Sequence, residues 1–491
     1  MNAWILSIAA LYILIVLAIG VWASYRTHDS KDFYIAGRNL GLFVMAIAMF
    51  SSIQSGFGIV GGTSQVTDGG YGFISGVMVA TPLGFALTWF LLGKRVVKIG
   101  RMDELYTIGD VAEFRYQSRA ARGILALTVL LGVIGYLGTQ VLAMGFVVAV
   151  IFDVSVTTGA ILGMIILGIY VIGGGILAGV YTDFFQGTLM LVVSVIVFFY
   201  AIDSGGGIKS MMQTLHSENP ELTSPWGLSP LIAIPCWIFL FSLGGSAQPH
   251  GLTKFLMLKE YKSLRWGSFV SGLAYAITTL MVIAIGTAVL VLTIRGEFPE
   301  IGSPDRAFTS YLTEYTPAPI AGLAIAGLLA AIMSTGSSFL TLGAASVVRD
   351  FPRTFKKAVT RELLWSRIAV GVLLVAATVF ALYIGNLVAI LGTFGWGTFA
   401  AGLFPALVLG LVWKRGTKAA AITSASISLI LNFVLEVGGK YGFEPLPEGV
   451  IIGAFSFAVS LIVYIVISFL TPAATARDET PAELDAVLDG H

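Results

Sequence analysis

The sequence predicts an all-α polytopic membrane protein with thirteen transmembrane helices. The first observation is the composition: 57% of the 491 residues are hydrophobic and only 11% are charged, whereas soluble domains carry about 25% charged residues. The second is that apolar stretches of about twenty residues, the length that crosses the hydrocarbon core of a bilayer, recur along the whole chain. Because lipid-exposed backbone must satisfy its own hydrogen bonds, and the alternating pattern of a β-barrel is absent from the sequence, these stretches are expected to be helices.

The spans follow one another through short polar connections. The first has no basic segment before it and no small-residue cleavage site after it, so we expect a retained helix and not a signal peptide. The predicted spans cover residues 3–24, 41–67, 73–93, 123–151, 156–178, 182–203, 229–249, 264–294, 317–347, 363–384, 387–413, 418–438 and 449–471.

The placement of basic residues gives the topology. If the N-terminus lies outside, all but four of the 28 lysine and arginine residues fall in cytoplasmic loops or in the C-terminal tail. The exceptions are Lys209, Arg295, Arg306 and Lys440. The positive-inside rule predicts such a bias, and one missed span would destroy it. We therefore expect a multi-pass protein of the cell inner membrane, with its N-terminus outside and its C-terminus in the cytoplasm.

Composition also excludes several classes of protein. The net charge of +1 argues against a nucleic-acid partner, which requires a basic field. Cys236 is the single cysteine, so an intrachain disulfide and a cysteine-based metal cage are excluded, and the four histidines are scattered. The motifs H-E-x-x-H, G-x-S-x-G and the P-loop are missing from the sequence, so no enzyme class is indicated.

Two spans have centres that favour a broken helix. Residues 51–58 of the second span read SSIQSGFG, and residues 242–250 of the seventh read SLGGSAQPH. Four spans separate them, so they are expected to be the first helices of two halves. A five-plus-five inverted repeat with two broken helices is typical of transporters. The alternative is that these glycines only allow helices to pack closely.

This organisation divides the chain into six segments. They are the first transmembrane helix with a cytoplasmic linker (1–40), the first five-helix repeat (41–204), an external loop (205–228), the second five-helix repeat (229–413), two C-terminal transmembrane helices (414–471), and an acidic cytoplasmic tail (472–491) that we expect to be disordered.

Polar residues within the spans are candidates for ion binding. Ser334, Ser338 and Thr341 of the ninth span share one helical face. Their hydroxyls offer oxygen ligands to sodium, although such hydroxyls can also bond carbonyls of their own helix. Asp183 begins the sixth span, and a carboxylate inside a membrane is by default functional. The alternative is that Asp183 is a solvated loop residue.

In the order and spacing of its motifs, the chain resembles the sodium/solute symporter family, which has the leucine-transporter-type fold. It is nearest the branch that carries proline, pantothenate and monocarboxylates. The resemblance covers about residues 5–470. It rests on Ala36-Gly37-Arg38-Asn39-Leu40, Ser55-Gly56, Gln248-Pro249-His250 followed by Lys254-Phe255, Ala331 to Ser338, and Phe394-Gly395-Trp396-Gly397 leading to Pro405 and Trp413-Lys414-Arg415.

The resemblance implies which residues bind sodium. One site would use the backbone carbonyls of Ser51, Gln54 and Ala331 and the hydroxyls of Ser334 and Thr335. Some members of the family have a second sodium site of one aspartate and three serines, which Asp183, Ser334, Ser337 and Ser338 match. One or two sodium ions are therefore expected.

A substrate pocket is expected between the broken helices. Its candidate lining residues are Phe57, Tyr136, Gln140, Phe241, Gly245 and Trp396; the aromatic ones can equally be packing residues. Two departures from the family pattern bear on the substrate. Ile53 stands where proline carriers of this family have an aspartate, which weakens a proline assignment, and Lys254 stands where the motif more often has an arginine.

The chain is therefore predicted to be no enzyme but a sodium-coupled symporter that works by alternating access. Its solute is expected to bear a carboxylate, as a monocarboxylate, an amino acid or a pantothenate-like compound does. The expected partners are this solute and the lipid bilayer, and no obligate protein partner is evident. The alternatives are a proton-coupled symporter in which Asp183 or His250 titrates, a membrane solute sensor with a separate signalling partner, and a passive channel, although no charge ring marks a pore.

Overall fold

The computed structural model describes residues 3–27, 29–36, 40–102, 105–259, 264–384 and 388–472. Within these ranges the secondary structure is helical, and the pairing of Leu40 with Leu258 is an isolated bridge. The all-α prediction is confirmed. Two predictions lie outside the described residues: Gly37-Arg38-Asn39 of the first family motif, and residues 473–491 of the C-terminal tail.

Long helices alternate with short caps and breaks along the chain. The elements of the first half are α1 Ala3–Ser24, α2 Ser30–Ile35, α3 Leu42–Ile53, η2 Phe57–Gly61, α4 Gly62–Gly69, α5 Gly72–Leu87, η3 Thr88–Gly93, α6 Lys94–Met102, α7 Ile108–Tyr116, α8 Arg119–Phe152, α9 Val156–Ser204, α10 Ile208–Glu218 and η4 Pro220–Thr223. Those of the second half are α11 Ala233–Ser242, η5 Gly244–Ala247, α12 Pro249–Met257, α13 Leu264–Ile294, η6 Pro304–Arg306, α14 Ala307–Tyr315, α15 Ala318–Ala345, η7 Ser346–Asp350, α16 Phe351–Thr354, α17 Glu362–Ile384, α18 Val388–Leu403, η8 Phe404–Leu409, α19 Gly410–Val412, α20 Lys418–Lys440 and α21 Ile452–Leu470.

Ten helices in the described part of the chain are long and apolar enough to cross a membrane, or eleven if one bent pair counts as a span. The predicted number of thirteen is thus not confirmed. The two other predicted spans are helical but shorter: residues Val156–Ile172 form an apolar first part of α9, and residues 233–257 are divided among α11, η5 and α12.

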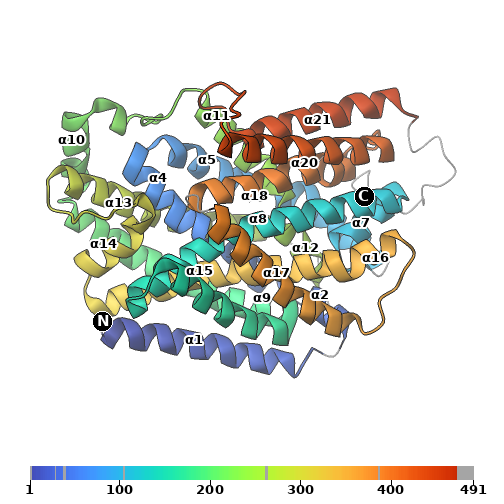
Figure 1. Cartoon of the computed structure of the whole chain (residues 1–491), viewed down its shortest axis with the longest axis horizontal. Helices are drawn as coiled ribbons and strands as arrows, with labels where there is room; N and C mark the ends of the chain where they lie inside the picture. Colours follow the sequence, from blue (N-terminus) through green and yellow to red (C-terminus); the bar gives the residue numbers. More distant parts are fainter. Residues whose placement is uncertain are drawn as a thin grey trace.

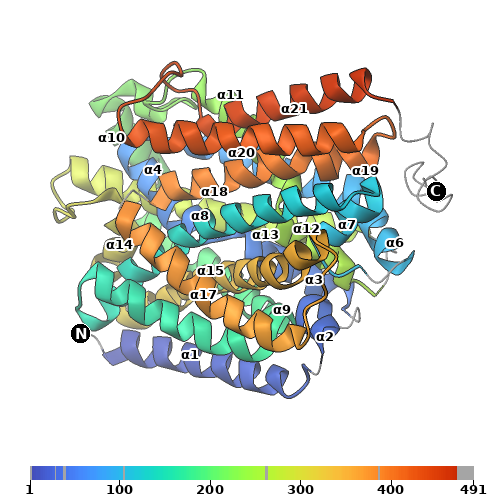
Figure 2. The ribbon, with the colours of Figure 1, turned by 45° about the vertical axis from the view of Figure 1, so that its right-hand side comes forward.

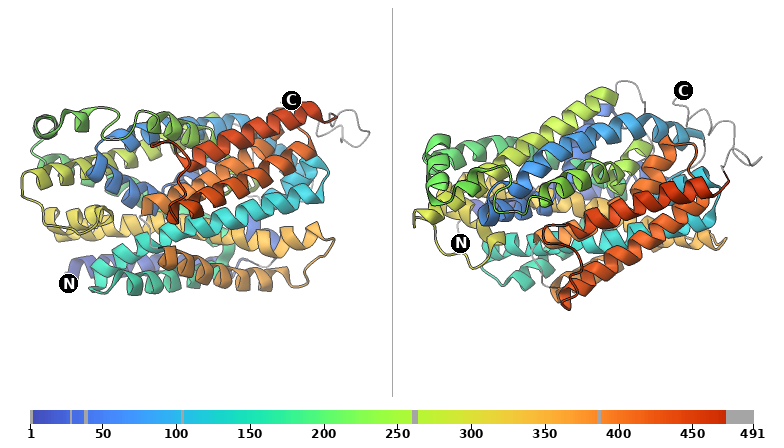
Figure 3. Two further views of the ribbon diagram at one scale, coloured as in Figure 1. Left: turned by 45° about the horizontal axis from the view of Figure 1, so that its top comes forward. Right: turned by 90° about the horizontal axis from the view of Figure 1, so that it is seen from above.

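The helices form one bundle in which most long axes run in a similar direction (Figure 1). The start of α1 lies at the same end as α10 and α14, whereas α6 and α7 lie at the opposite end (Figure 2). We call these the α10 end and the α7 end. Helices α20 and α21 pack against each other at one edge of the bundle (Figure 3).

The outer helices expose large apolar side chains, as expected for contact with lipid. Leu14 of α1 is 63% exposed and Val375 of α17 is 64% exposed. By contrast, 89% of the apolar stretch within Ile390–Val412, which covers most of α18, is buried inside the bundle. Large apolar surfaces are unfavourable in water and favourable in lipid, so this exposed apolar surface supports the membrane assignment.

Both predicted breaks are present. The axis bends by 57° between α3 and the helical segment that begins at Phe57. In the seventh predicted span, α11 ends at Ser242, and Gln248 is extended (φ −64°, ψ 120°) before α12 begins at Pro249. Proline has no backbone N–H and is favoured at the first position of a helix, so Pro249 ends one helix and begins the next. We call residues 51–58 the first break and residues 242–250 the second break.

Candidate functional site

The first break is built from the carbonyl end of α3 and the side of α15. Ser334 Oγ donates hydrogen bonds to the carbonyl oxygens of Ser51 at 2.8 Å and of Ala331 at 3.2 Å. Thr335 Oγ1 lies 3.0 Å from the carbonyl oxygen of Ser52 and 3.3 Å from that of Gln54. The structure therefore brings together all five groups of the predicted first sodium site.

The local chain explains why these carbonyls are free to bind. The last carbonyls of a helix have no N–H partner in the next turn. Here the backbone of Gln54 turns extended (φ −73°, ψ 116°), so the helix stops directly after Ile53. The carbonyl end of a helix also carries a partial negative charge. Such an end, with unwound carbonyls beside it, is the typical coordination site for sodium in transporters with broken helices.

The site is buried and closely packed. Ser51, Gln54, Ser334 and Thr335 are at most 1% exposed. Helix α9 comes very near, because a Cβ added to Gly187 would lie 3.1 Å from the carbonyl oxygen of Ile47 and from the Cβ of Ser51. The carbonyl of Ser52, which sequence reasoning omitted, also belongs to the cluster through Thr335.

Helix α8 holds the other side of the first break. The Gln140 Oε1 atom accepts a hydrogen bond from the backbone N–H of Gly56 at 3.1 Å, and the hydroxyls of Ser55 and Tyr136 lie 3.0 Å apart. The Gln140 amide nitrogen donates to Thr139 Oγ1 at 2.7 Å. The Gly56 N–H and the Ser55 hydroxyl thus have protein partners, whereas Gln54 Oε1 and Ser51 Oγ are buried without a partner among the described residues.

The predicted substrate-lining residues also lie together. The ring centroids of Phe57 and Phe241 are 6.0 Å apart and stacked, and those of Phe241 and Trp396 are 5.0 Å apart. Tyr136 lies 6.2 Å from both Phe57 and Trp396. A Cβ on Gly245 would lie 3.5 Å from the Trp396 ring. Gln140 accepts a hydrogen bond from Gly56, so all six residues lie around the two breaks, and their aromatic rings pack on one another.

At the second break, Ser246 and the Gln248 amide nitrogen bond nearby carbonyls, but other buried polar atoms lack partners in the described part of the chain. Gln248 Oε1 and both ring nitrogens of His250 have no hydrogen-bond partner among the described residues, although these side chains are 1% and 2% exposed. The His250 ring lies 4.7 Å from the ring of Phe339, which in turn lies 4.9 Å from Tyr136. Sequence analysis gave Gln248 no site role, and His250 only a titrating role in the proton-coupled alternative. Their signal is their position, directly after the glycine-rich break.

The hydroxyls of α15 divide into two groups. Ser337 donates to the carbonyl of Ser334 at 3.0 Å and Thr341 to that of Ser337 at 3.0 Å, so these two bond their own helix. Ser334 and Thr335 instead reach across to the first break. Ser338 Oγ is buried without a partner in the described part of the chain.

Asp183 lies inside α9 and is fully buried, so its interpretation as a solvated loop residue is wrong. Its Oδ2 atom is 2.8 Å from the Nζ atom of Lys254 in α12, whose side chain is 1% exposed. The Asp183 Oδ1 atom has no partner among the described residues. Ser337, which the second predicted sodium site assigns to Asp183, bonds to Ser334 instead.

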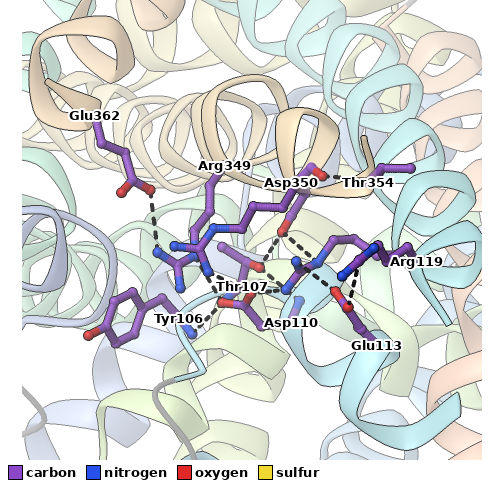
Figure 4. Close-up of polar contacts among 11 residues, drawn as sticks. Tyr106, Thr107, Asp110, Glu113, Arg119, Arg349, Asp350, Thr354 and Glu362 are labelled. Atoms are coloured by element: carbon purple, nitrogen blue, oxygen red, sulfur yellow. Dashed lines mark hydrogen bonds and ion pairs between the residues drawn. The ribbon is translucent and has the colours of Figure 1, made fainter. Parts of the chain in front are cut away.

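The α7 end carries a network of ion pairs (Figure 4). Asp110 of α7 accepts hydrogen bonds from Arg122 of α8 and, at 3.0 Å, from Arg349 of η7. Thr107 donates to Asp350 at 2.6 Å. These contacts join elements that are distant in sequence, and sequence analysis did not predict them.

At the α10 end, a single carboxylate joins two elements. Asp305 of η6 accepts a hydrogen bond from the backbone N–H of Val388, at the start of α18, at 2.9 Å. Burial raises the pKa of the Asp305 carboxyl, and this hydrogen bond partly opposes the rise.

Comparison with known proteins places this geometry among transporters. The model of the sodium:solute symporter family matches residues 33–427. The chain is 26% identical to the osmoregulated proline transporter OpuE of Bacillus subtilis (strain 168), over 96% of each protein. It is 25% identical to the sodium/pantothenate symporter of Escherichia coli (strain K12), over 91% of this chain and 94% of that protein.

Solved structures confirm the predicted leucine-transporter-type fold. A sodium-coupled sialic acid symporter in a substrate-bound outward-open state has a TM-score of 0.78 at 19% identity, over 96% of this chain and 99% of that one. A nucleobase-cation-symport-1 family transporter in a closed conformation has a TM-score of 0.58 at 16% identity, over 94% and 99% of the two chains. At these identities the likeness concerns the fold.

Proposed function

The chain belongs to the sodium:solute symporter family, and from that premise we propose that it carries a small carboxylate-bearing solute together with sodium bound at the first break. Family membership and the proline and pantothenate relatives show sodium-coupled symport of a small solute, and not an enzyme. The observation that carries the proposed site is the convergence of Ser334 and Thr335 on the carbonyls of α3.

The proposed sodium site uses oxygens that already lie in contact. Ser334 and Thr335 now donate their hydroxyl protons to the carbonyls of Ser51 and Gln54. When sodium binds, these hydroxyls rotate their protons away, so that hydroxyl and carbonyl oxygens all present lone pairs to the ion. The ion then replaces hydrogen bonds between α15 and α3 by stronger contacts, which links the two elements.

The solute class rests on the relatives and on the second break. Proline and pantothenate, which two relatives are named for, both bear a carboxylate. Gln248 Oε1 and the His250 nitrogens are unpartnered among the described residues, and the His250 ring packs on Phe339, which in turn contacts Tyr136. A solute with a small apolar body and polar substituents would fill both, because buried polar groups require hydrogen-bond partners.

We also propose the set of Asp183, Ser334, Ser337 and Ser338 as a cation site. Two of its oxygens, Asp183 Oδ1 and Ser338 Oγ, are buried without partners among the described residues. The Asp183 carboxylate is also paired with Lys254 at 2.8 Å, so a cation already lies beside this set.

The mechanism that we propose is alternating access. Sodium holds α15 against the first break, which completes the solute site between the two breaks, and the breaks then open to the other side of the membrane. One charge moving through 100 mV releases about 2.3 kcal/mol, enough for roughly 50-fold accumulation of a solute without net charge, such as a zwitterionic amino acid. The charge of an anionic solute would cancel that of one sodium ion. The α10 end is proposed to face outward and the α7 end the cytoplasm, in the inner membrane.

The test uses the purified protein in liposomes. Uptake and thermal stability would be measured for proline, pantothenate, acetate, pyruvate, lactate, sialic acid and galactose, each in sodium and in choline. We expect one carboxylate solute to be taken up, only in sodium and only while Ser334 is intact. Uptake that is the same in choline, or driven by a pH gradient alone, would contradict the proposal.

A further inference from the structure

A buried ion pair joins α12 to α9 beside the first break. Lys254 Nζ lies 2.8 Å from Asp183 Oδ2, and the two side chains are 1% and 0% exposed. Isolated charges are very unfavourable in such surroundings, so each of these residues depends on the other for its charge balance. Sequence analysis noted Lys254 only as a departure from the family motif, and the structure gives it a defined partner.

The position of Asp183 follows from its neighbours on α9. One turn before it, a Cβ on Gly179 would lie 3.7 Å from Ser337 Oγ. One turn after it, a Cβ on Gly187 would lie 3.1 Å from the Cβ of Ser51. Residues four apart share a helical face. Asp183 therefore faces the strip between Ser337 and Ser51, which is the place expected for a second cation next to the first break.

One of the two Asp183 carboxylate oxygens has no hydrogen-bond partner among the described residues. Asp183 Oδ2 accepts from Lys254, whereas Oδ1 has no partner among the described residues. Ser338 Oγ, on the same stretch of α15, is also unpartnered in the described part of the chain and is 2% exposed. The site thus has oxygens for a cation, but the negative charge that would hold the cation is already neutralised.

We propose that the ammonium of Lys254 is a tethered cation that takes the place of a second sodium at Asp183, so that this chain binds one sodium ion per transport cycle. A sodium ion on the same carboxylate would stand next to the ammonium, and like charges repel strongly where water is excluded. The inference rests on the proposed function, because it counts ions in a symporter whose first sodium lies at the first break.

The experiment measures binding of radioactive ²²Na⁺ to the purified full-length protein, so that it does not depend on knowing the solute. We expect one sodium per chain in the wild type. Lys254→Gln leaves the Asp183 charge open and is expected to bind two. Lys254→Arg keeps a cation in place and is expected to bind one, which makes it the matched control.

A second variant serves if Lys254→Gln does not fold. The double variant Asp183→Asn/Lys254→Gln removes both charges together, and we expect it to bind one sodium with an affinity within about threefold of the wild type. If Asp183 is a sodium ligand in the wild type, this double variant instead loses one ion, and the inference is overturned.

The outcomes separate the inference from the proposed function. Two sodium ions per wild-type chain, or one ion in a folded Lys254→Gln variant, overturn the role of Lys254 and leave sodium coupling in place. Absence of sodium binding in the wild type overturns the proposed function itself.

Discussion

The two helix breaks contain similar residues but differ in the groups that meet at each of them. At the first break, Ser334 and Thr335 bond the carbonyls of α3, and Gln140 bonds the N–H of Gly56. At the second break, Gln248 Oε1 and both His250 nitrogens are unpartnered within the described residues. Ser51 Oγ and Gln54 Oε1 of the first break are unpartnered too within the described residues. The breaks therefore differ in the hydroxyl and carbonyl oxygens that converge at the first and in the unpartnered histidine ring at the second.

This difference indicates that the two breaks bind different ligands. A cluster of converging oxygens with little freedom suits a small ion of fixed size, and the first break supplies such a cluster. Open donors and acceptors next to aromatic rings suit an organic solute, and the second break supplies these. If this comparison is correct, mutations at the first break change the sodium response, whereas mutations at the second break change the response to solute.

The largest effect is expected from removing both hydroxyls of the first break. Hydrogen-bonding groups contribute about 1.5–3 kcal/mol each when they contact a charge, so Ser334→Ala/Thr335→Ala should lose about 3–6 kcal/mol of sodium binding. The sodium concentration for half-maximal uptake should rise on the order of 100-fold or more. Uptake measured against sodium concentration checks this.

The matched control is Ser424→Ala/Ser428→Ala, which removes two buried hydroxyls that bond their own helix α20. It should leave the sodium response unchanged. An equal shift in both double variants would mean that buried hydroxyls matter only for stability, and the comparison of the two breaks would lose its basis.

A variant far from both breaks should affect stability alone. Asp110→Asn removes the charge that Arg122 and Arg349 share at the α7 end (Figure 4). Breaking a buried ion pair from one side destabilises by about 3–5 kcal/mol, so the free energy of unfolding should fall by about 3 kcal/mol. Denaturation of the purified variant measures this, with exposed Asp68→Asn as control. A change in the half-saturating sodium concentration would show that the first break is coupled to this network.

A smaller and more selective effect is expected at the second break. His250→Ala removes ring nitrogens that are unpartnered among the described residues. A neutral hydrogen bond from one of them to the solute would contribute about 1.4 kcal/mol, so the KM for solute should rise about tenfold. The half-saturating sodium concentration should stay within about twofold. The exposed His216→Ala in α10 is the control. A variant that weakens sodium and solute binding equally would contradict the separation of the two breaks.

The smallest effect concerns Asp305, next to the helix that continues from the first break. Burial raises the pKa of this carboxyl, so the folded protein holds its proton more tightly than the unfolded chain. Stability should therefore fall as the pH rises from 3.8 through the raised pKa. Asp305→Asn should remove this dependence, and its advantage over the wild type should vanish towards low pH. Thermal unfolding across pH tests the sign.

The breaks were predictable because local chemistry determines them. Pro249 lacks an N–H, and Gly56 and Gly245 mark the places where helices end or approach closely, so the positions could be read from the sequence. The grouping of Ser334 and Thr335 with Ser51 followed from the resemblance to the family. The number of spans was less predictable, because residues 233–257 divide into pieces too short to be counted by length.

The ionic contacts were not predictable, because they join residues far apart in the chain. Lys254 and Asp183 are separated by 71 positions, and Arg349 and Asp110 by 239. Their side-chain types indicate charge, but only the packing of α12 and α9 on α3, and of η7 near α7, determines which partners meet. The sequence offered Asp183 as a sodium ligand or a solvated loop residue, and it gave no sign of the pair with Lys254.

The most direct test of the first break is sodium binding itself. ²²Na⁺ binding would be measured on purified wild type, Ser334→Ala and Ser424→Ala at a series of sodium concentrations. A sodium ligand at Ser334 predicts that Ser334→Ala binds at least about tenfold more weakly than the wild type, while Ser424→Ala binds as the wild type does. Wild-type sodium affinity in a folded Ser334→Ala variant would contradict the assignment of the first break as the sodium site.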